Sequence, residues 1–140
     1  MGKEIVSVNY DRISEIYDTS RAAHPETVEK LGRLLSISGN SKILDMGCGT
    51  GNYIYALRKM TDKIIGLDMS AGMLAQAKTK YPKISFVQAD VTNLPFKSET
   101  FDGTFAVQVL HHIKEKERFL REAHRNPAKT GAYRFARLLP

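Results

Sequence analysis

The sequence predicts an α/β fold, a Rossmann-like doubly wound parallel sheet, and two observations carry this prediction. Short apolar runs that end in or near an acid recur along the 140-residue chain, and amphipathic stretches with helical spacing separate them. Strands that alternate with helices form a parallel sheet with right-handed crossovers. In addition, residues 43–53 have the pattern of a buried strand, three alternating glycines and the start of a helix, which is how such a unit opens.

Apolar runs bounded by turn residues predict the strands. The first run ends at Gly47, Gly49 and Gly51, where glycine lets the chain turn sharply and lets a ligand approach the backbone. The second run ends in Asp68, and the third ends near Asp90. The first strand and its glycine loop occupy residues 42–51, and the other predicted strands are residues 63–68, 84–87 and 101–109.

Apolar residues at helical spacing predict the helices. Pro25 suits the first turn of one helix, and Ser70 suits the N-cap of another. Met73, Leu74 and Ala77 are expected to form the apolar stripe of the helix that Ser70 begins. The other predicted helices are residues 13–17, 52–60 and 115–125.

Composition indicates one globular domain, with 42% hydrophobic and 26% charged residues. No apolar run approaches the roughly 20 residues that a membrane helix needs, and residues 1–4 lack the apolar core of a signal peptide. The single cysteine, Cys48, cannot form an internal disulfide, which fits a reducing compartment. We therefore expect a cytoplasmic protein.

The net charge of +6 is unevenly distributed. Residues 1–113 hold 13 Lys/Arg and 12 Asp/Glu, a net of +1, whereas residues 114–140 hold 8 Lys/Arg and 3 Asp/Glu, a net of +5. A basic tail of this kind either binds nucleic acid or acidic lipid or is a solvated end of the chain. A third interpretation, which we prefer, is that the basic tail results from a change of reading frame.

Acids stand at or near the ends of the first three predicted strands: Asp45, Asp68 and Asp90. Each alone has the pattern of an N-cap or loop carboxylate. Because ligands of a doubly wound sheet bind outside the carboxyl ends of its strands, three acids at one edge indicate a site. Asp68, about 20 residues beyond the first glycine, suits ribose hydroxyls. Asp90 suits the exocyclic amine of adenine, and Asp45 suits a cationic group or holds the glycine loop.

The glycine loop argues against a dinucleotide. The dinucleotide fingerprint is G-x-G-x-x-G, but Asn52 takes the position of its third glycine. No Lys-Ser/Thr pair follows, which excludes a P-loop, and Asp45 would repel a pyrophosphate. The combination predicts a nucleoside ligand that carries a positive charge.

Residues 45–51, Asp-Met-Gly-Cys-Gly-Thr-Gly, resemble motif I of the class I S-adenosylmethionine-dependent methyltransferases. Residues 67–74 resemble the next motif, and residues 89–96 resemble the segment that binds the adenine amine. Residues 101–112 resemble the fourth strand of the small-molecule "type 11" branch, which includes the quinone methyltransferases. The resemblance covers roughly residues 8–125.

This resemblance implies S-adenosyl-L-methionine as the cofactor and no metal. Asp68 would bind the ribose, Met69 would pack on adenine, and Asp90 and Val91 would bind adenine. Gln108 would line the cofactor near the sulfonium. At the methionine end the implied residues are Asp45, Gly47, Cys48, Gly49 and Gly51.

The resemblance also implies a division of the chain into segments. Residues 1–40 would form an N-terminal helical cap, in which Tyr10-Asp11 and Tyr17-Asp18 are similar to the cap of that branch. Residues 41–125 would form the S-adenosylmethionine-binding domain, and residues 126–140 an aberrant basic tail.

The implied reaction is methyl transfer to a small-molecule acceptor by in-line displacement at the sulfonium methyl. Such a methyl is already activated, so the enzyme mainly has to position the two reactants. A base is needed only where the nucleophile starts protonated. His111 and His112 are the candidate bases, and the alternative is that they support the loop or the core.

Residues 126–140 depart from the family, which continues with a turn like Arg-Val-Leu-Lys-Pro-Gly-Gly and a fifth strand. Here the stretch has several arginines and no strand period, which indicates a truncation or a frameshift. Residues 126–140 can be encoded by a set of synonymous codons that, when read one base later, gives Ile-Leu-Gln-Lys-Pro-Gly-Arg-Ile-Val-Leu-Leu-Asp. The sheet is then expected to hold only the first four of the family's seven strands. Phe105, Val107 and Val109 would lie on an exposed edge that invites self-association.

The predicted function is therefore that of an S-adenosylmethionine-dependent methyltransferase of the small-molecule branch. One alternative is a catalytically inactive, cofactor-binding remnant of such an enzyme. A nicotinamide oxidoreductase is disfavoured by Asn52 and Asp45, and a nucleic-acid binder would have to use residues 114–140.

Overall fold

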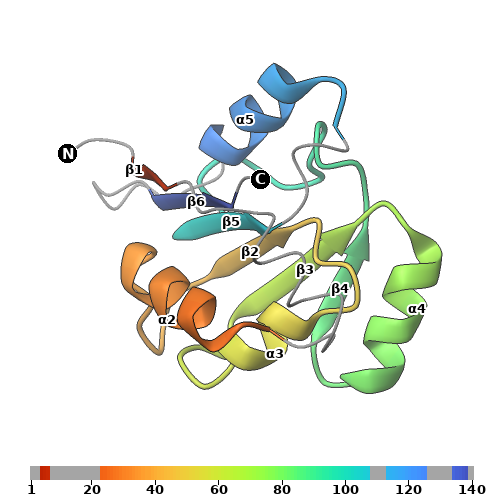
Figure 1. Ribbon diagram of the computed structural model, residues 1–140. Coiled ribbons are helices and arrows are strands. Elements are labelled where there is room, and N and C mark those ends of the chain that lie inside the picture. The colour runs from red at the N-terminus through yellow and green to blue at the C-terminus, as the bar shows by residue number, and fades with distance from the viewer. Residues whose placement is uncertain (1–3, 7–22, 108–112, 126–133, 139–140) are drawn as a thin grey trace.

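A six-stranded parallel sheet with helices on both faces forms the described part of the chain (Figure 1). The computed structural model describes residues 4–6, 23–107, 113–125 and 134–138. The strands are β1 (Glu4–Val6), β2 (Ile43–Met46), β3 (Ile64–Asp68), β4 (Ser85–Gln88), β5 (Gly103–Val107) and β6 (Arg134–Leu138). The helices are α2 (Pro25–Leu34), α3 (Asn52–Leu57), α4 (Ala71–Lys80) and α5 (Lys116–Arg125).

The strand order is β1-β6-β5-β2-β3-β4, and every pair is parallel. Ile43 at the start of β2 pairs with Ile64 of β3 on one side and with Gly103 of β5 on the other, so the three strands run in step. The four predicted strands are thus confirmed as neighbours in the order β4-β3-β2-β5. This register brings the carboxyl ends of β2, β3, β4 and β5 to one edge of the sheet.

Two apolar clusters cover the two faces of the sheet. Successive residues of β2 alternate between them: Ile43 packs in one cluster and Leu44 in the other. The first cluster includes side chains of α2, α3 and α4, and the second includes Phe119 and Ala123 of α5. Every residue of β2 and β5 is buried, so these central strands are mostly apolar in the sequence, and Asp45 and Thr104 are their buried polar residues.

Local signals placed the helix starts correctly. Pro25 is the first residue of α2, and the Ser70 side chain accepts a hydrogen bond from the Met73 N–H at 3.2 Å, which caps α4. α3 is shorter than predicted and ends at Leu57. The predicted helix at 13–17 lies outside the described residues. Within the described part of the chain, no helix has the length and apolar character to cross a bilayer.

The sheet does not stop at the fourth predicted strand, and this corrects the expectation of an exposed edge. β6 pairs with β5 along its length, from Thr104 with Phe135 to Val107 with Leu138, and β1 pairs with β6. The basis for self-association through Phe105 and Val107 is thereby removed, while Val109 lies outside the described residues. β1 likewise places a strand in a segment expected to be helical. The physical reason is that the backbone N–H and C=O groups of β5 need partners, and a neighbouring backbone supplies them whatever its side chains.

Candidate functional site

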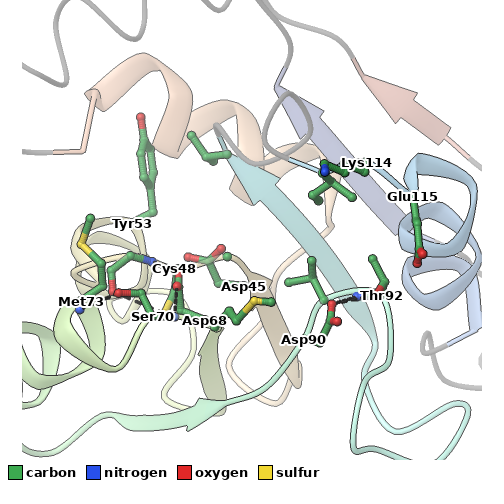
Figure 2. Close-up of a pocket in the computed structure, with 16 residues that line it drawn as sticks. Asp45, Cys48, Tyr53, Asp68, Ser70, Met73, Asp90, Thr92, Lys114 and Glu115 are labelled. Atoms are coloured by element: carbon green, nitrogen blue, oxygen red, sulfur yellow. Dashed lines mark hydrogen bonds between the residues drawn. The ribbon is translucent and has the colours of Figure 1, made fainter.

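A cavity of about 630 Å³ lies at the carboxyl edge of the sheet (Figure 2). Its volume is in the range of about 300–1,000 Å³ that is typical of small-molecule and cofactor sites. Carboxylates at the carboxyl ends of β2 and β3 and just beyond β4 all reach it. The lining residues are Asp45, Gly47, Cys48, Gly49, Tyr53, Asp68, Met69, Ser70, Met73, Asp90, Val91, Thr92, Val107, Ile113, Lys114 and Glu115.

The glycine loop is a sharp turn fixed to the neighbouring strand. Gly47, Gly49 and Gly51 have φ values of 86°, 57° and 85°, in the left-handed region that favours glycine. The N–H groups of Gly47 and Cys48 both donate to the Leu67 carbonyl, at 2.7 and 2.9 Å. These two hydrogen bonds therefore fix the loop to the end of β3 without a ligand.

Asp68 links the glycine loop to the start of α4. Its Oδ2 accepts the Gly49 N–H at 2.8 Å, and its Oδ1 accepts the Ser70 N–H at 2.9 Å. An ionised carboxylate has about four lone-pair sites, so about two sites remain for a ligand that donates hydrogen bonds. The two hydrogen bonds from backbone N–H groups fix the direction of the carboxylate, so it can accept hydrogen bonds from a diol without rearranging.

Asp45 is the most deeply buried acid of the cavity, with 3% of its surface exposed. Within the described part of the chain, its Oδ1 is buried and has no hydrogen-bond partner. Burial first, and then the charge of neighbouring Asp68, raise the pKa of Asp45 well above its ordinary value. A buried carboxyl oxygen without a partner is costly, so this position favours a ligand that brings positive charge or a hydrogen-bond donor.

Replacing Asp45 with asparagine is expected to raise the free energy of unfolding at neutral pH by about 1 kcal/mol, because an unpaired buried acid is removed. The wild-type protein should lose stability as the pH rises above about 3.9, since the unfolded carboxyl ionises there while the folded one holds its proton. The loss should end once the pH passes the raised pKa of the folded state. Urea unfolding at a series of pH values measures both effects. If the Asp45→Asn variant were less stable than the wild type at every pH, the carboxylate would have to be paired.

Asp90 forms the exposed end of the row of acids. Its Oδ1 accepts the Thr92 N–H at 2.8 Å and the Thr92 hydroxyl at 2.7 Å, and these hydrogen bonds lower the pKa of Asp90. It therefore stays ionised and acts only as an acceptor at neutral pH. Val91 beside it lines the same cavity.

Two methionines give this part of the cavity an open apolar wall. Met69 is 60% exposed and Met73 is 45% exposed, although most large apolar side chains of the described chain are buried. Of the predicted apolar stripe of α4, Leu74 and Ala77 are buried, whereas Met73 lines the cavity. The first turn of α4 turns Met73 towards the cavity, where a flat apolar ligand would cover it.

Some lining residues carried no signal in the sequence. Tyr53 follows the glycine loop and is 4% exposed, and Lys114 and Glu115 reach the cavity from the segment that leads into α5. Figure 2 shows Tyr53 at one side of the cavity and the latter two at the other. They join the site through the topology of the chain, which a local motif does not reveal.

Cys48 is not arranged as a nucleophile. Burial first, and then the charges of Asp45 and Asp68, raise the pKa of the Cys48 thiol far above its ordinary value. Its side chain packs in the core beneath the loop. Gln108, His111 and His112 lie outside the described residues, and the described residues contain no cluster of acids, histidines and cysteines that suits a metal ion.

Comparison with known proteins decides the family. The family model described as a methyltransferase domain, Methyltransf_11, matches residues 44–135. The chain belongs to this family of class I S-adenosylmethionine-dependent methyltransferases. The resemblance read from residues 45–51 and the later motifs is thereby confirmed.

Two similar curated proteins are methyltransferases. A malonyl-[acyl-carrier protein] O-methyltransferase of Hamiltonella defensa is 32% identical and aligns with 96% of this chain and 55% of its own length. A 2-phytyl-1,4-naphtoquinone methyltransferase of Nostoc punctiforme is 30% identical, over 89% of this chain and 60% of its own. The chain thus spans somewhat more than half the length of these relatives.

Solved structures agree in fold. A putative S-adenosyl-L-methionine-dependent methyltransferase of Methanococcus maripaludis superposes with a TM-score of 0.74 over 98% of this chain and 67% of its own, at 20% identity. The [4+2]-cyclase SpnF superposes with a TM-score of 0.71 over 77% of this chain and 42% of its own, at 25% identity. The same fold therefore also occurs in a protein named for a different reaction, so the residues of the site have to carry the functional argument.

Proposed function

We propose that this chain binds S-adenosyl-L-methionine in the cavity and takes part in methyl transfer to a small-molecule acceptor. The observation that carries the proposal is the row of three acids in one cavity, with a buried unpaired oxygen on Asp45 at its deep end. The cofactor has matching groups in that order: a cationic amino acid end, a ribose diol and an adenine amine. The bound cofactor supplies a methyl group activated by a positively charged sulfur.

Each part of the cavity has a role in this proposal. Asp45 and the backbone of residues 47–51 hold the methionine end, where the unpaired oxygen accepts a hydrogen bond and the cation of the ligand favours ionisation of the carboxyl. Asp68 keeps lone pairs for the two ribose hydroxyls. Met69 and Met73 cover the faces of the base, and the ionised Asp90 with Val91 meets its edge.

The acceptor is proposed only as a class. The two relatives are named for a malonyl group on a carrier protein and for a naphthoquinone, so their names share methyl transfer but not an acceptor chemistry. A role for nucleic acid is not part of the proposal, because Arg134–Leu138 form a strand between β1 and β5, so this stretch is not a free basic tail.

Calorimetry with S-adenosylhomocysteine and with NAD tests the proposal. We expect binding of S-adenosylhomocysteine and none of NAD, because Asn52 and Asp45 replace features that a pyrophosphate requires. Binding of NAD in preference would contradict it. A methyl-transfer assay with quinone, carboxylate and amine acceptors then separates an enzyme from a cofactor-binding protein without turnover, which would bind the nucleoside but transfer nothing.

A further inference from the structure

Glu122 and Arg125 form a two-pronged ion pair in the last turn of α5. The Arg125 Nε lies 2.7 Å from the Glu122 Oε2, and the Arg125 Nη2 lies 2.9 Å from the Oε1. Their side chains are only 14% and 29% exposed, respectively. Hydrogen bonding between the two lowers the pKa of Glu122 and raises that of Arg125, so both stay charged.

This pair also holds the backbone of residues 94–99, which lie well before α5 in the chain. The Leu94 N–H donates to the Glu122 Oε1 at 2.6 Å, while the Leu94 carbonyl accepts from the Arg125 Nη2 at 3.2 Å. The Arg125 Nη1 donates to the Phe96 carbonyl at 2.8 Å, and the Arg125 carbonyl accepts the Glu99 N–H at 3.1 Å. We call this set of contacts the clamp.

The clamped segment continues directly from the adenine side of the cavity. Asp90 and Thr92 line the cavity, the Asn93 N–H donates to the Asp90 carbonyl at 3.0 Å, and Leu94 is the first residue that the clamp holds. Residues 90–99 belong to no helix or strand. Their backbone groups therefore need partners outside the helix and strand ladders, and the clamp supplies several of these partners.

The segment that leads into α5 also lines the cavity, on the side of Asp90 and Thr92 (Figure 2). Ile113, Lys114 and Glu115 line it just before α5 begins, and Glu115 accepts from Arg118 at 2.8 Å. The cavity wall at residues 113–115 thus continues into α5, whose last turn holds residues 94–99. A shift of the clamp would therefore move Asp90 relative to the rest of the cavity.

We propose that Glu122 and Arg125 are positioning residues that set the place of Asp90 and Val91, and thereby the preference of the site for adenine over other bases. The inference rests on the proposed function, since it assigns the base to Asp90 and Val91. Arg125 suits this task because one planar group with five donors holds two backbone carbonyls and a carboxylate together.

The test compares Arg125→Lys and Glu122→Gln with the wild-type chain in two measurements. The first is the ratio of the dissociation constants of S-inosylhomocysteine, in which a carbonyl replaces the adenine amine, and S-adenosylhomocysteine. The second is hydrogen exchange of the amides of residues 91–99 without ligand. We expect Arg125→Lys to lower the ratio at least about tenfold, as for one lost hydrogen bond to a charged group, and to speed exchange in the loop. Glu122→Gln keeps an acceptor for Leu94 and should have the smaller effect.

Thr61→Ala is the matched control. The Thr61 hydroxyl is buried and donates to the Ser41 carbonyl at 2.7 Å, but it lies before β3, at the opposite edge of the sheet from the cavity. It should destabilise the chain and leave both the ratio and the loop exchange unchanged. If Arg125→Lys lowered stability but left the ratio and the exchange like the control, the clamp would be merely structural and the proposal overturned. If the wild-type chain bound neither nucleoside, the proposed function would fail. Unchanged hydrogen exchange of residues 91–99 in both Arg125→Lys and Glu122→Gln would separately refute the role of the clamp.

Discussion

Replacing Asp68 with alanine is expected to weaken S-adenosylhomocysteine binding at least about 100-fold, because hydrogen bonds to a charged group are worth roughly 1.5–3 kcal/mol each. The carboxylate has two tasks that alanine removes together. It would accept the ribose hydroxyls, and it already accepts the N–H groups of Gly49 and Ser70, which hold the loop and α4 in place. Calorimetry with the variant and the wild-type chain measures the loss.

Two further variants make this result specific. Asp62→Ala removes an exposed acid just before β3, away from the cavity, and should leave binding unchanged. Asp68→Asn keeps one acceptor oxygen and should lose less affinity than Asp68→Ala. It should also lower the pKa of Asp45, since the charge of Asp68 is the second cause of that raised pKa. Equal affinity of Asp68→Ala and wild type would refute the assignment of the ribose to this residue.

The central part of the fold was predictable because its signals are local. Buried parallel strands are rich in apolar residues, and the apolar runs at Asp45 and before Asp68 correspond to β2 and β3. Ser70 and Pro25 mark helix starts through contacts within one turn of the chain. The row of three acids was predictable for a related reason, since parallel strands bring their carboxyl ends to one edge whatever lies between them.

The outer strands and the clamp were not predictable in this way. β6 contains Arg134 and Arg137, and a strand with two arginines gives no apolar run, so only its pairing with β5 identifies it. The contacts of Arg125 with Leu94 and Phe96 span 31 and 29 positions, and no spacing in the sequence encodes them. The exposure of Met73 was not predictable either, because the first turn of α4 opens on a cavity that the spacing of apolar residues does not reveal.

The position of β6 bears on the interpretation of the last residues. The apolar run Ile-Val-Leu-Leu-Asp of the shifted frame would occupy positions 133–137, and β6 occupies Arg134–Leu138. The backbone thus forms a strand where the other frame would place an apolar one. The reading frame itself stays a prediction, which the nucleotide sequence beyond codon 125 tests.

Replacing Gly51 with alanine is expected to lower the free energy of unfolding by about 2–4 kcal/mol, from left-handed backbone strain and overpacking together. Gly51 has φ of 85° and forms the N-cap of α3. A Cβ there would lie 2.9 Å from Cζ of Phe86 and 3.3 Å from Cδ2 of Tyr81. Tyr81 has little room to yield, because its ring stacks on Tyr55 at 4.6 Å and its hydroxyl donates to the Asn52 Oδ1 at 2.9 Å. Urea unfolding measures the change.

Two other glycines separate the strain from the overpacking. Gly49 has φ of 57°, and no described atom lies within 4 Å of a Cβ added there. Gly49→Ala should therefore lower the free energy of unfolding only by the backbone strain, about 1–2 kcal/mol. Gly39→Ala has neither feature within the described structure and should change stability by less than about 0.5 kcal/mol. If Gly51→Ala cost no more than Gly49→Ala, the packing of Phe86 and Tyr81 against the loop would be loose. The graded order Gly39, Gly49, Gly51 would instead mean that the loop's shape is enforced both by its own backbone and by the side chains beneath it. Such a loop would present its backbone to a ligand without a further cost of ordering.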